Sequence, residues 1–137
     1  HLYQRLFSPN IILLSNDDQL ISELHPLIPV YRVLKRTKYD LTISKRINQL
    51  IDAIDPHIVM CINTYSFFLT RLGQLFKQKQ KFILSPHSTI PFSKYNYFQN
   101  LIYFRVLHPT DSILYLCEAQ KSFLKNLYGR FFLSSGF

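Results

Sequence analysis

Glycine is scarce in this sequence of 137 residues, which contains only Gly73, Gly129 and Gly136. None of them follows a predicted strand into a predicted helix, where a dinucleotide-binding domain carries its glycine-rich phosphate loop. The sequence therefore excludes a loop of that kind. Long apolar runs are also missing. No stretch approaches the roughly 18 apolar residues that a membrane span needs, and we expect no signal peptide.

Cysteine is rare as well. Cys61 and Cys117 each close a predicted strand, so we expect two small buried residues in a reducing compartment. A disulfide between them stays open, but two cysteines do not make a disulfide scaffold. The five histidines are scattered along the chain and show no metal-ligand spacing, so we expect no metal site. No serine elbow or cysteine–histidine pair is recognisable.

Acidic residues are few, with 8 Asp and Glu against 16 Lys and Arg. Residues 1–70 hold seven basic and six acidic side chains, whereas residues 71–137 hold nine and two, so +7 of the net charge of +8 lies in the second half. Such a field favours an anionic partner, for example a phospholipid surface, a diphosphate or a nucleic acid. The alternative is a compositional bias toward Lys, Asn, Ile, Phe and Tyr.

Strand-like and helix-like segments alternate along the chain, which is long enough for one domain with a real core. Asp40 is the expected N-cap of one helix, and Gly129 the expected C-cap of another. The segment 57–62 is too apolar to be half exposed, so we expect an interior strand of a parallel sheet. Predicted strands span 10–14, 30–34, 57–62, 81–84, 112–116 and 130–133; predicted helices span 41–54, 65–79, 92–107 and 118–128.

This alternation with short links predicts an α/β fold: a doubly wound, mostly parallel, Rossmann-like sheet with helices on both faces. We interpret residues 1–137 as a single domain of this type. In such sheets ligands bind at the carboxyl ends of the strands. The polar residues that follow the strands should share that edge; they are Asn63, Thr64, Ser85, His87, Ser88, Thr89, Cys117 and Glu118. A histidine that only caps the next helix or bonds a loop carbonyl is the plainer interpretation of His87.

Two other chemistries can be tested against the sequence. Asp17 and Asp18 follow a strand like the acidic pair of a phosphoacceptor receiver domain, but the strand at 57–62 ends without the carboxylate that would accept the phosphoryl group. The receiver interpretation fails, and the pair is better explained as a turn or cap. Nucleic-acid binding would depend on the basic, aromatic segment 94–105, where stacking requires exposed aromatic rings. We expect most of those rings to pack in a core.

The order of motifs resembles the N-terminal, acceptor-binding half of a retaining family 4 glycosyltransferase of the GT-B type. The resemblance is carried by Asp55-Pro56-His57-Ile58-Val59, by FILSPHST at 82–89, by the stretch from Asp111 through SILYLCEAQKSFL, and by FFLSSGF at 131–137. It spans roughly residues 40–137. His57 replaces the usual aspartate and Ser135 the usual asparagine. The chain opens on what looks like the tail of the family's first helix, so the resemblance implies a GT-B half lacking its first strand.

The resemblance implies a role for His87 in the cleft, where it would hydrogen-bond a sugar hydroxyl or position the acceptor. Ser88, Thr89 and Lys94 become candidate acceptor contacts, together with Asn63, Thr64 and Glu118 at the same edge. A nucleotide-sugar donor would bind mainly to a C-terminal domain that this sequence lacks. No metal or other cofactor is expected, because in the GT-B scheme helix dipoles and basic residues take the place of a cation. Alone, this half should not catalyse transfer.

The whole enzyme would then be a cytoplasmic, membrane-associated hexosyltransferase that builds a surface polysaccharide or glycolipid from a sugar or lipid-linked acceptor. The aromatic, basic helix at 92–107 suits an interfacial position at the inner face of a membrane. The alternative for that helix is an interior position under the sheet. The alternative for the whole chain is a non-catalytic α/β module that binds an anionic surface or a protein partner. Nucleic acid is not an expected partner.

Overall fold

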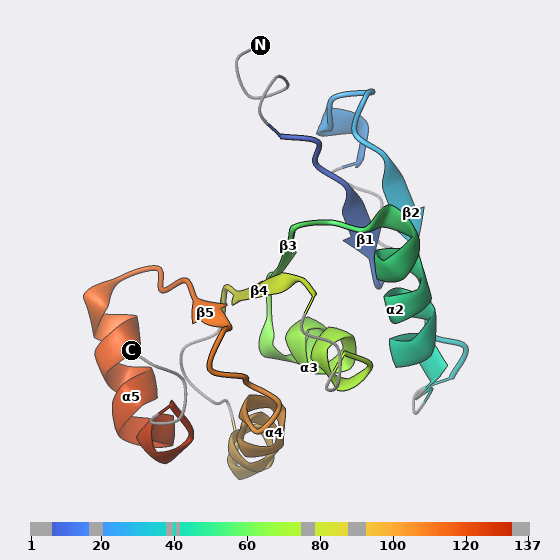
Figure 1. The fold of residues 1–137 in the computed structure, drawn as a ribbon. Helices are drawn as coiled ribbons and strands as arrows, with labels where there is room; N and C mark the ends of the chain where they lie inside the picture. The colour runs from blue at the N-terminus through green and yellow to red at the C-terminus, as the bar shows by residue number, and fades with distance from the viewer. Residues whose placement is uncertain are drawn as a thin grey trace. The chain divides into compact units, whose positions relative to one another are not determined.

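The computed structural model describes residues 7–16, 21–37, 40, 42–74, 79–87 and 93–132. The chain divides into two units, His1–Arg46 and Ile47–Phe137. Figure 1 shows the elements in chain order. The interpretation of residues 1–137 as a single domain stays a prediction, and the two units are described one after the other.

The first unit contains a two-stranded parallel sheet. Strand β1 (Ile11–Leu13) pairs with β2 (Val30–Arg32), with Ile12 opposite Tyr31. A single turn of 3-10 helix, η1 (Ile21–Glu23), lies between them in the chain. Branched apolar side chains favour extended backbone here, and both predicted strands are confirmed, although shorter. The expected turn at Asp17 and Asp18 lies outside the described residues.

Helix α2 (Thr42–Ile54) begins in the first unit and continues in the second. Asp40 caps it as predicted, because its Oδ1 accepts the Thr42 N–H at 3.0 Å and its Oδ2 accepts the Arg36 N–H at 2.9 Å. These bonds, with one from the Thr42 hydroxyl as the largest cause, lower the pKa of Asp40 to about 2. The helix stops at Asp55, whose φ of 52° is left-handed, and Pro56 follows.

The second unit is built on a three-stranded parallel sheet in the order β3-β4-β5. Its strands are β3 (Ile58–Cys61), β4 (Lys81–Leu84) and β5 (Ser112–Ile113). Helix α3 (Thr64–Leu72) follows β3, α4 (Lys94–Phe104) follows β4, and α5 (Glu118–Phe132) follows β5. Parallel strands with a helix after each one confirm the predicted α/β, Rossmann-like fold class.

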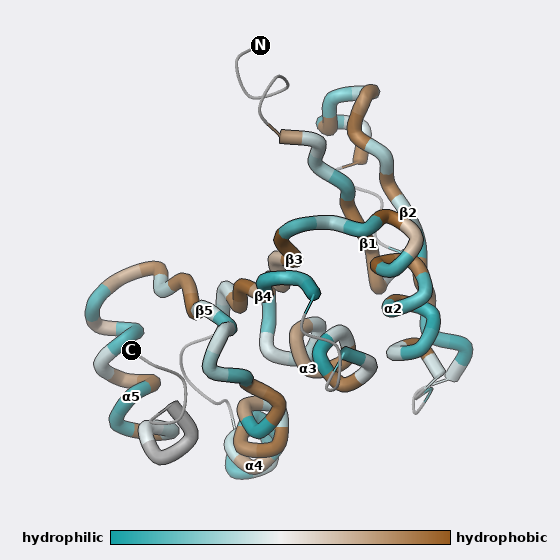
Figure 2. Tube along the Cα trace, viewed as in Figure 1, coloured by the Kyte–Doolittle hydropathy of each residue, from teal (hydrophilic) through white to brown (hydrophobic). Residues whose placement is uncertain are grey.

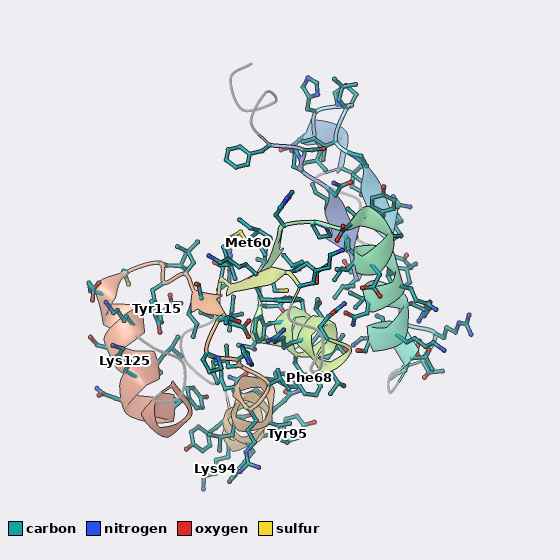
Figure 3. The ribbon with its side chains drawn as sticks, in the orientation of Figure 1. Met60, Phe68, Lys94, Tyr95, Tyr115 and Lys125 are labelled. Atoms are coloured by element: carbon teal, nitrogen blue, oxygen red, sulfur yellow. The ribbon has the colours of Figure 1, made fainter. Side chains whose placement is uncertain are left out.

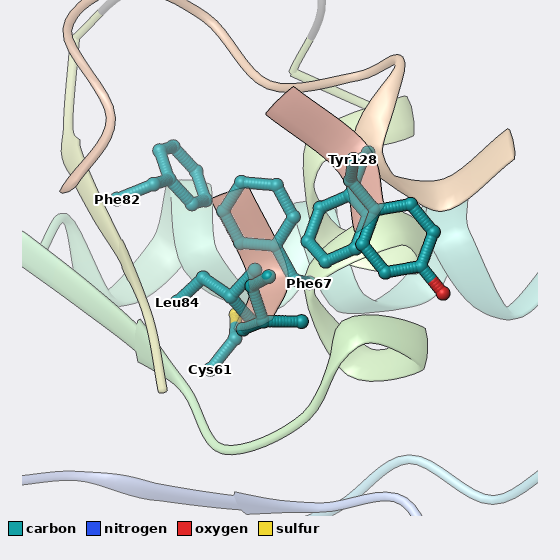
Figure 4. Close-up of a cluster of buried hydrophobic side chains, with 7 residues drawn as sticks. Cys61, Phe67, Phe82, Leu84 and Tyr128 are labelled. Carbon is teal, nitrogen blue, oxygen red and sulfur yellow. The ribbon is translucent and has the colours of Figure 1, made fainter. Parts of the chain in front are cut away.

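One hydrophobic cluster receives side chains from all three of these helices (Figure 4). Phe82 and Leu84 of β4 belong to this cluster and are fully buried. The rings of Phe67 and Phe82 meet edge to face, with centroids 6.4 Å apart. The cluster comprises Cys61, Phe67, Phe82, Leu84, Phe104, Leu124 and Tyr128.

Helix α2 contacts α3 through a polar side chain, because Asn48 Nδ2 donates to the Thr70 carbonyl at 3.0 Å.

The expectation that segment 57–62 is an interior strand is wrong for the sheet as described. Strand β3 is at one edge of the order β3-β4-β5. Successive residues of a strand point to opposite faces, so Cys61 joins the cluster while Ile58 and Met60 point away and are each 53% exposed. Figure 2 shows the hydrophobic character of this segment. Apolar composition alone did not reveal that one face is uncovered among the described residues.

Several predicted boundaries are corrected as well. Residues 130–132 belong to α5 and not to a strand, so Gly129 lies inside a helix and is not a C-cap. The helix predicted at 65–79 ends at Leu72, where Gly73 caps it. The strand predicted at 112–116 ends at Ile113. Cys61 is buried as expected, but Cys117 is exposed, because β5 ends before it.

Candidate functional site

The carboxyl ends of β3, β4 and β5 meet at one edge of the sheet. The Ser85 N–H donates to the Cys61 carbonyl at 2.8 Å, and the Leu114 N–H donates to the Leu84 carbonyl at 2.8 Å. These bonds continue the parallel register past the ends of the strands. The segments that leave β3, β4 and β5 therefore start side by side, as the topology predicted. We call this edge, with the residues that follow each strand, the carboxyl edge.

His87 lies on the carboxyl edge with an exposed side chain, after the buried pair Ser85 and Pro86. A histidine in this position is not part of the core. Its backbone is held by a neighbouring element: Gln120 Nε2 donates to the Pro86 carbonyl at 2.7 Å, and Gln120 Oε1 accepts the Leu116 N–H at 2.8 Å. The chain segments after β4 and β5 are thereby joined at the residue that precedes His87.

Gln120 is a residue that the sequence analysis did not single out. Its side chain leaves the first turn of α5 and is only 2% exposed. A buried amide needs partners for both its donor and its acceptor, and here they come from two different segments of the carboxyl edge. The signal in the sequence was a glutamine at an otherwise inward-facing position, four residues before the buried Leu124.

Asn63 and Thr64 also lie at the carboxyl edge, but their side chains already have structural roles. Asn63 caps α3 by accepting the Ser66 N–H at 2.7 Å, and the Ser66 hydroxyl completes a capping box. The Thr64 hydroxyl donates to Asn100 Oδ1 at 3.0 Å, which links α3 to α4. Asn63 therefore caps the start of α3, and Thr64 attaches that start to α4.

The remaining candidate residues are distributed over the starts of α4 and α5. Lys94 is the first residue of α4, is exposed and points outward (Figure 3). Glu118 is the first residue of α5, is also exposed, and lies 3.4 Å from Lys121 Nζ through its Oε1. Glu118 follows β5 and precedes Gln120, whose bonds join the segments after β4 and β5. Ser88 and Thr89 lie outside the described residues.

A buried ion pair joins α3 to the segment that leads into β5. Arg71 Nε lies 3.2 Å from Asp111 Oδ2, and both side chains are buried. The Arg71 guanidinium also stacks 4.9 Å from the centroid of the Phe82 ring. Burial raises the pKa of Asp111, although the His108 N–H and Arg71 oppose that shift. The pair joins α3 to the residue just before β5, so its role is to hold the sheet and helix together.

The described part of the chain shows neither a metal-binding cluster nor a reactive state of the Cys61 thiol. No group of three or more His, Cys, Asp or Glu side chains there could hold a metal ion. Burial raises the pKa of the Cys61 thiol to about 12, and a thiol in that state is not a nucleophile. No helix among the described residues has the length and apolar character to cross a membrane.

The family model described as Glycosyltransferase Family 4 matches residues 2–131. That span covers β1 through nearly all of α5, including the whole carboxyl edge. Comparisons with curated proteins and with solved structures find no match.

Proposed function

Because this chain belongs to glycosyltransferase family 4, we propose that its carboxyl edge binds the sugar acceptor of a retaining hexosyltransferase. The family as a whole transfers a sugar from a nucleotide-sugar donor to an acceptor. The observation that supports this placement is the exposed His87, which directly follows Pro86, the residue that Gln120 joins to the segment after β5. Ligands of parallel α/β sheets bind at this edge.

His87 would hydrogen-bond a hydroxyl of the acceptor or of the transferred sugar. In the transfer, the anomeric carbon exchanges its bond to the diphosphate oxygen for a bond to an acceptor hydroxyl oxygen, and that hydroxyl loses its proton. The departing diphosphate can take this proton, so His87 acts by positioning and need not be the base. Glu118 would accept a second hydroxyl, and Lys94 would attract an anionic group on the acceptor. Ser88, Thr89, Asn63 and Thr64 complete the proposed contacts.

The nucleotide sugar would bind mainly to a second domain, with no metal or other cofactor required from this half. The acceptor would be a growing polysaccharide or a lipid-linked sugar, and the enzyme would work in the cytoplasm at the inner face of the membrane. The charge asymmetry supports an anionic partner: residues 71–137 carry nine basic and two acidic side chains. A diphosphate-linked lipid acceptor and an anionic membrane both match that field.

The test is His87→Ala in the full-length transferase, with radiolabelled nucleotide sugars and a membrane lipid extract as acceptor. Loss of a hydrogen bond that orients the acceptor should lower kcat/KM for the acceptor by about tenfold or more. His57→Ala is the matched control, since His57 is an exposed histidine just before β3, at the amino end of that strand. Equal transfer by the two variants would remove His87 from the site.

A further inference from the structure

Helix α4 has an exposed apolar stripe on the side that does not enter the core. Tyr95, Phe98 and Ile102 are 73%, 62% and 58% exposed, respectively. Their spacing of three and four residues places them on successive turns of one helix face. Figure 3 shows Tyr95 pointing outward from α4. Three large apolar side chains on one face of one helix form a contiguous patch, and not the scattered exposure that is ordinary on protein surfaces.

The opposite face of α4 packs against the rest of the second unit. Phe104 is buried in the hydrophobic cluster, and the ring of Tyr97 stacks on that of Tyr128 with centroids 5.5 Å apart. Asn100 accepts the Thr64 hydroxyl bond from α3. The exposed stripe is therefore not needed to attach α4 to the rest of the unit.

Basic side chains border the stripe, and acidic ones are far away in the sequence. Lys94 begins α4 and Arg105 caps it, and both are exposed. At about 100° per residue, both fall beside Phe98 on the helical projection. No Asp or Glu occurs between Asp55 and Asp111. A helix face with aromatic and aliphatic side chains beside cations is the composition of segments that lie in the headgroup region of a bilayer.

We infer that the surface formed by Lys94, Tyr95, Phe98, Ile102 and Arg105, here named the α4 stripe, docks on an anionic phospholipid bilayer. The apolar side chains enter the boundary between headgroups and acyl chains, while the two cations contact phosphates. This inference gives the proposed membrane location a specific surface. The role of this membrane contact in sugar transfer rests on the proposed function, but lipid binding can be measured without any sugar transfer. Failure of one therefore does not imply failure of the other.

The chain contains no tryptophan, so a single indole can report on one surface. Tyr95→Trp places it in the α4 stripe. Vesicles of phosphatidylcholine and phosphatidylglycerol should shift its emission to the blue, and vesicles of phosphatidylcholine alone should not. The matched control is Met60→Trp, because Met60 is an apolar residue of comparable exposure on β3. No shift at position 95, an equal shift at position 60, or an equal shift with the neutral vesicles would overturn the inference.

Vesicle cosedimentation gives the contribution of each part of the stripe. Phe98→Ser should lower the partition coefficient by about tenfold, because a large apolar side chain no longer enters the interface. Lys94→Gln and Arg105→Gln should each lower it by about fivefold, and less at high salt. Met60→Ser should leave it unchanged. Unchanged binding of Phe98→Ser would contradict the inference. So would concentration-dependent dimerisation without vesicles that Phe98→Ser abolishes, because the stripe would then contact a second copy.

Discussion

The two units of the chain differ in how much core they have. In the first unit, the buried apolar side chains among the described residues are Val33 and Ile43, and no residue of the strands β1 and β2 is fully buried. In the second unit, seven side chains from strands and helices form one cluster, and an ion pair is buried beside it. A site that must hold its geometry belongs on the better packed scaffold, and the carboxyl edge belongs to the second unit.

The largest expected effect breaks the second unit. Phe82→Ala removes a fully buried ring that contacts Phe67 and lies under the Arg71 guanidinium. The loss of packing and the cavity left behind should lower the free energy of unfolding by about 3–5 kcal/mol. Ile12→Ala, at a half-buried position of β1, should cost about 1 kcal/mol. Urea denaturation of both variants measures the contrast, and equal costs would show that the two units are equally packed.

A smaller effect tests the contact between α2 and α3 within the second unit. A Cβ added at Gly73 would collide with Asn48 Nδ2, the atom that donates to the Thr70 carbonyl. Gly73 has φ −79°, so the backbone tolerates alanine and the cost is steric. Gly73→Ala should destabilise the protein by about 1–3 kcal/mol.

Two further variants distinguish the clash between an alanine at position 73 and Asn48 from a general effect of replacing glycine. Gly129→Ala lies inside α5, where nothing is within 4 Å of the added Cβ, and should be neutral or stabilising by up to ~1 kcal/mol. Combining Gly73→Ala with Asn48→Ala should recover part of the lost stability. Thermal unfolding of the set decides the matter: equal destabilisation by the two glycine replacements would rule out the close approach of α2 and α3.

The smallest effect concerns the first unit and depends on pH. The pKa of Asp40 is lowered from 3.8 to about 2 in the folded chain, so its cap stabilises α2 above pH 4 and is lost as the pH falls toward 2. Circular dichroism between pH 5 and pH 2 should show a loss of helix signal that Asp40→Asn does not share, because its cap does not titrate. Identical pH profiles would contradict the assigned cap.

Some features of the fold and of the candidate site could be predicted from the sequence alone. Strands β1, β3 and β4 were located closely, since runs such as Ile58–Cys61 have the branched side chains that extended backbone favours. The position of His87 at an edge followed from parallel topology alone. These inferences needed only local composition and the rule for parallel sheets.

Other features depended on contacts that no local pattern encodes. The helical state of residues 130–132 overrode an aromatic, strand-like composition. The burial of Arg71 was not predicted, because its partner Asp111 lies forty positions away in the chain. The exposure of Phe98 and the burial of Phe104 required the direction in which α4 packs. The Gln120 bonds to two segments were invisible for the same reason.

The central claim is that the segments after β4 and β5 act as one acceptor site. The most direct measurement compares Gln120→Met with Asn48→Leu in the full-length transferase, because each variant deletes a buried amide that donates to a backbone carbonyl, at 2.7 Å and 3.0 Å. Both should lose similar stability. Only Gln120→Met should raise the KM for the acceptor, by about tenfold, while the KM for the nucleotide sugar stays unchanged. Acceptor KM values that are equal in the two variants, with both proteins folded, would contradict the claim.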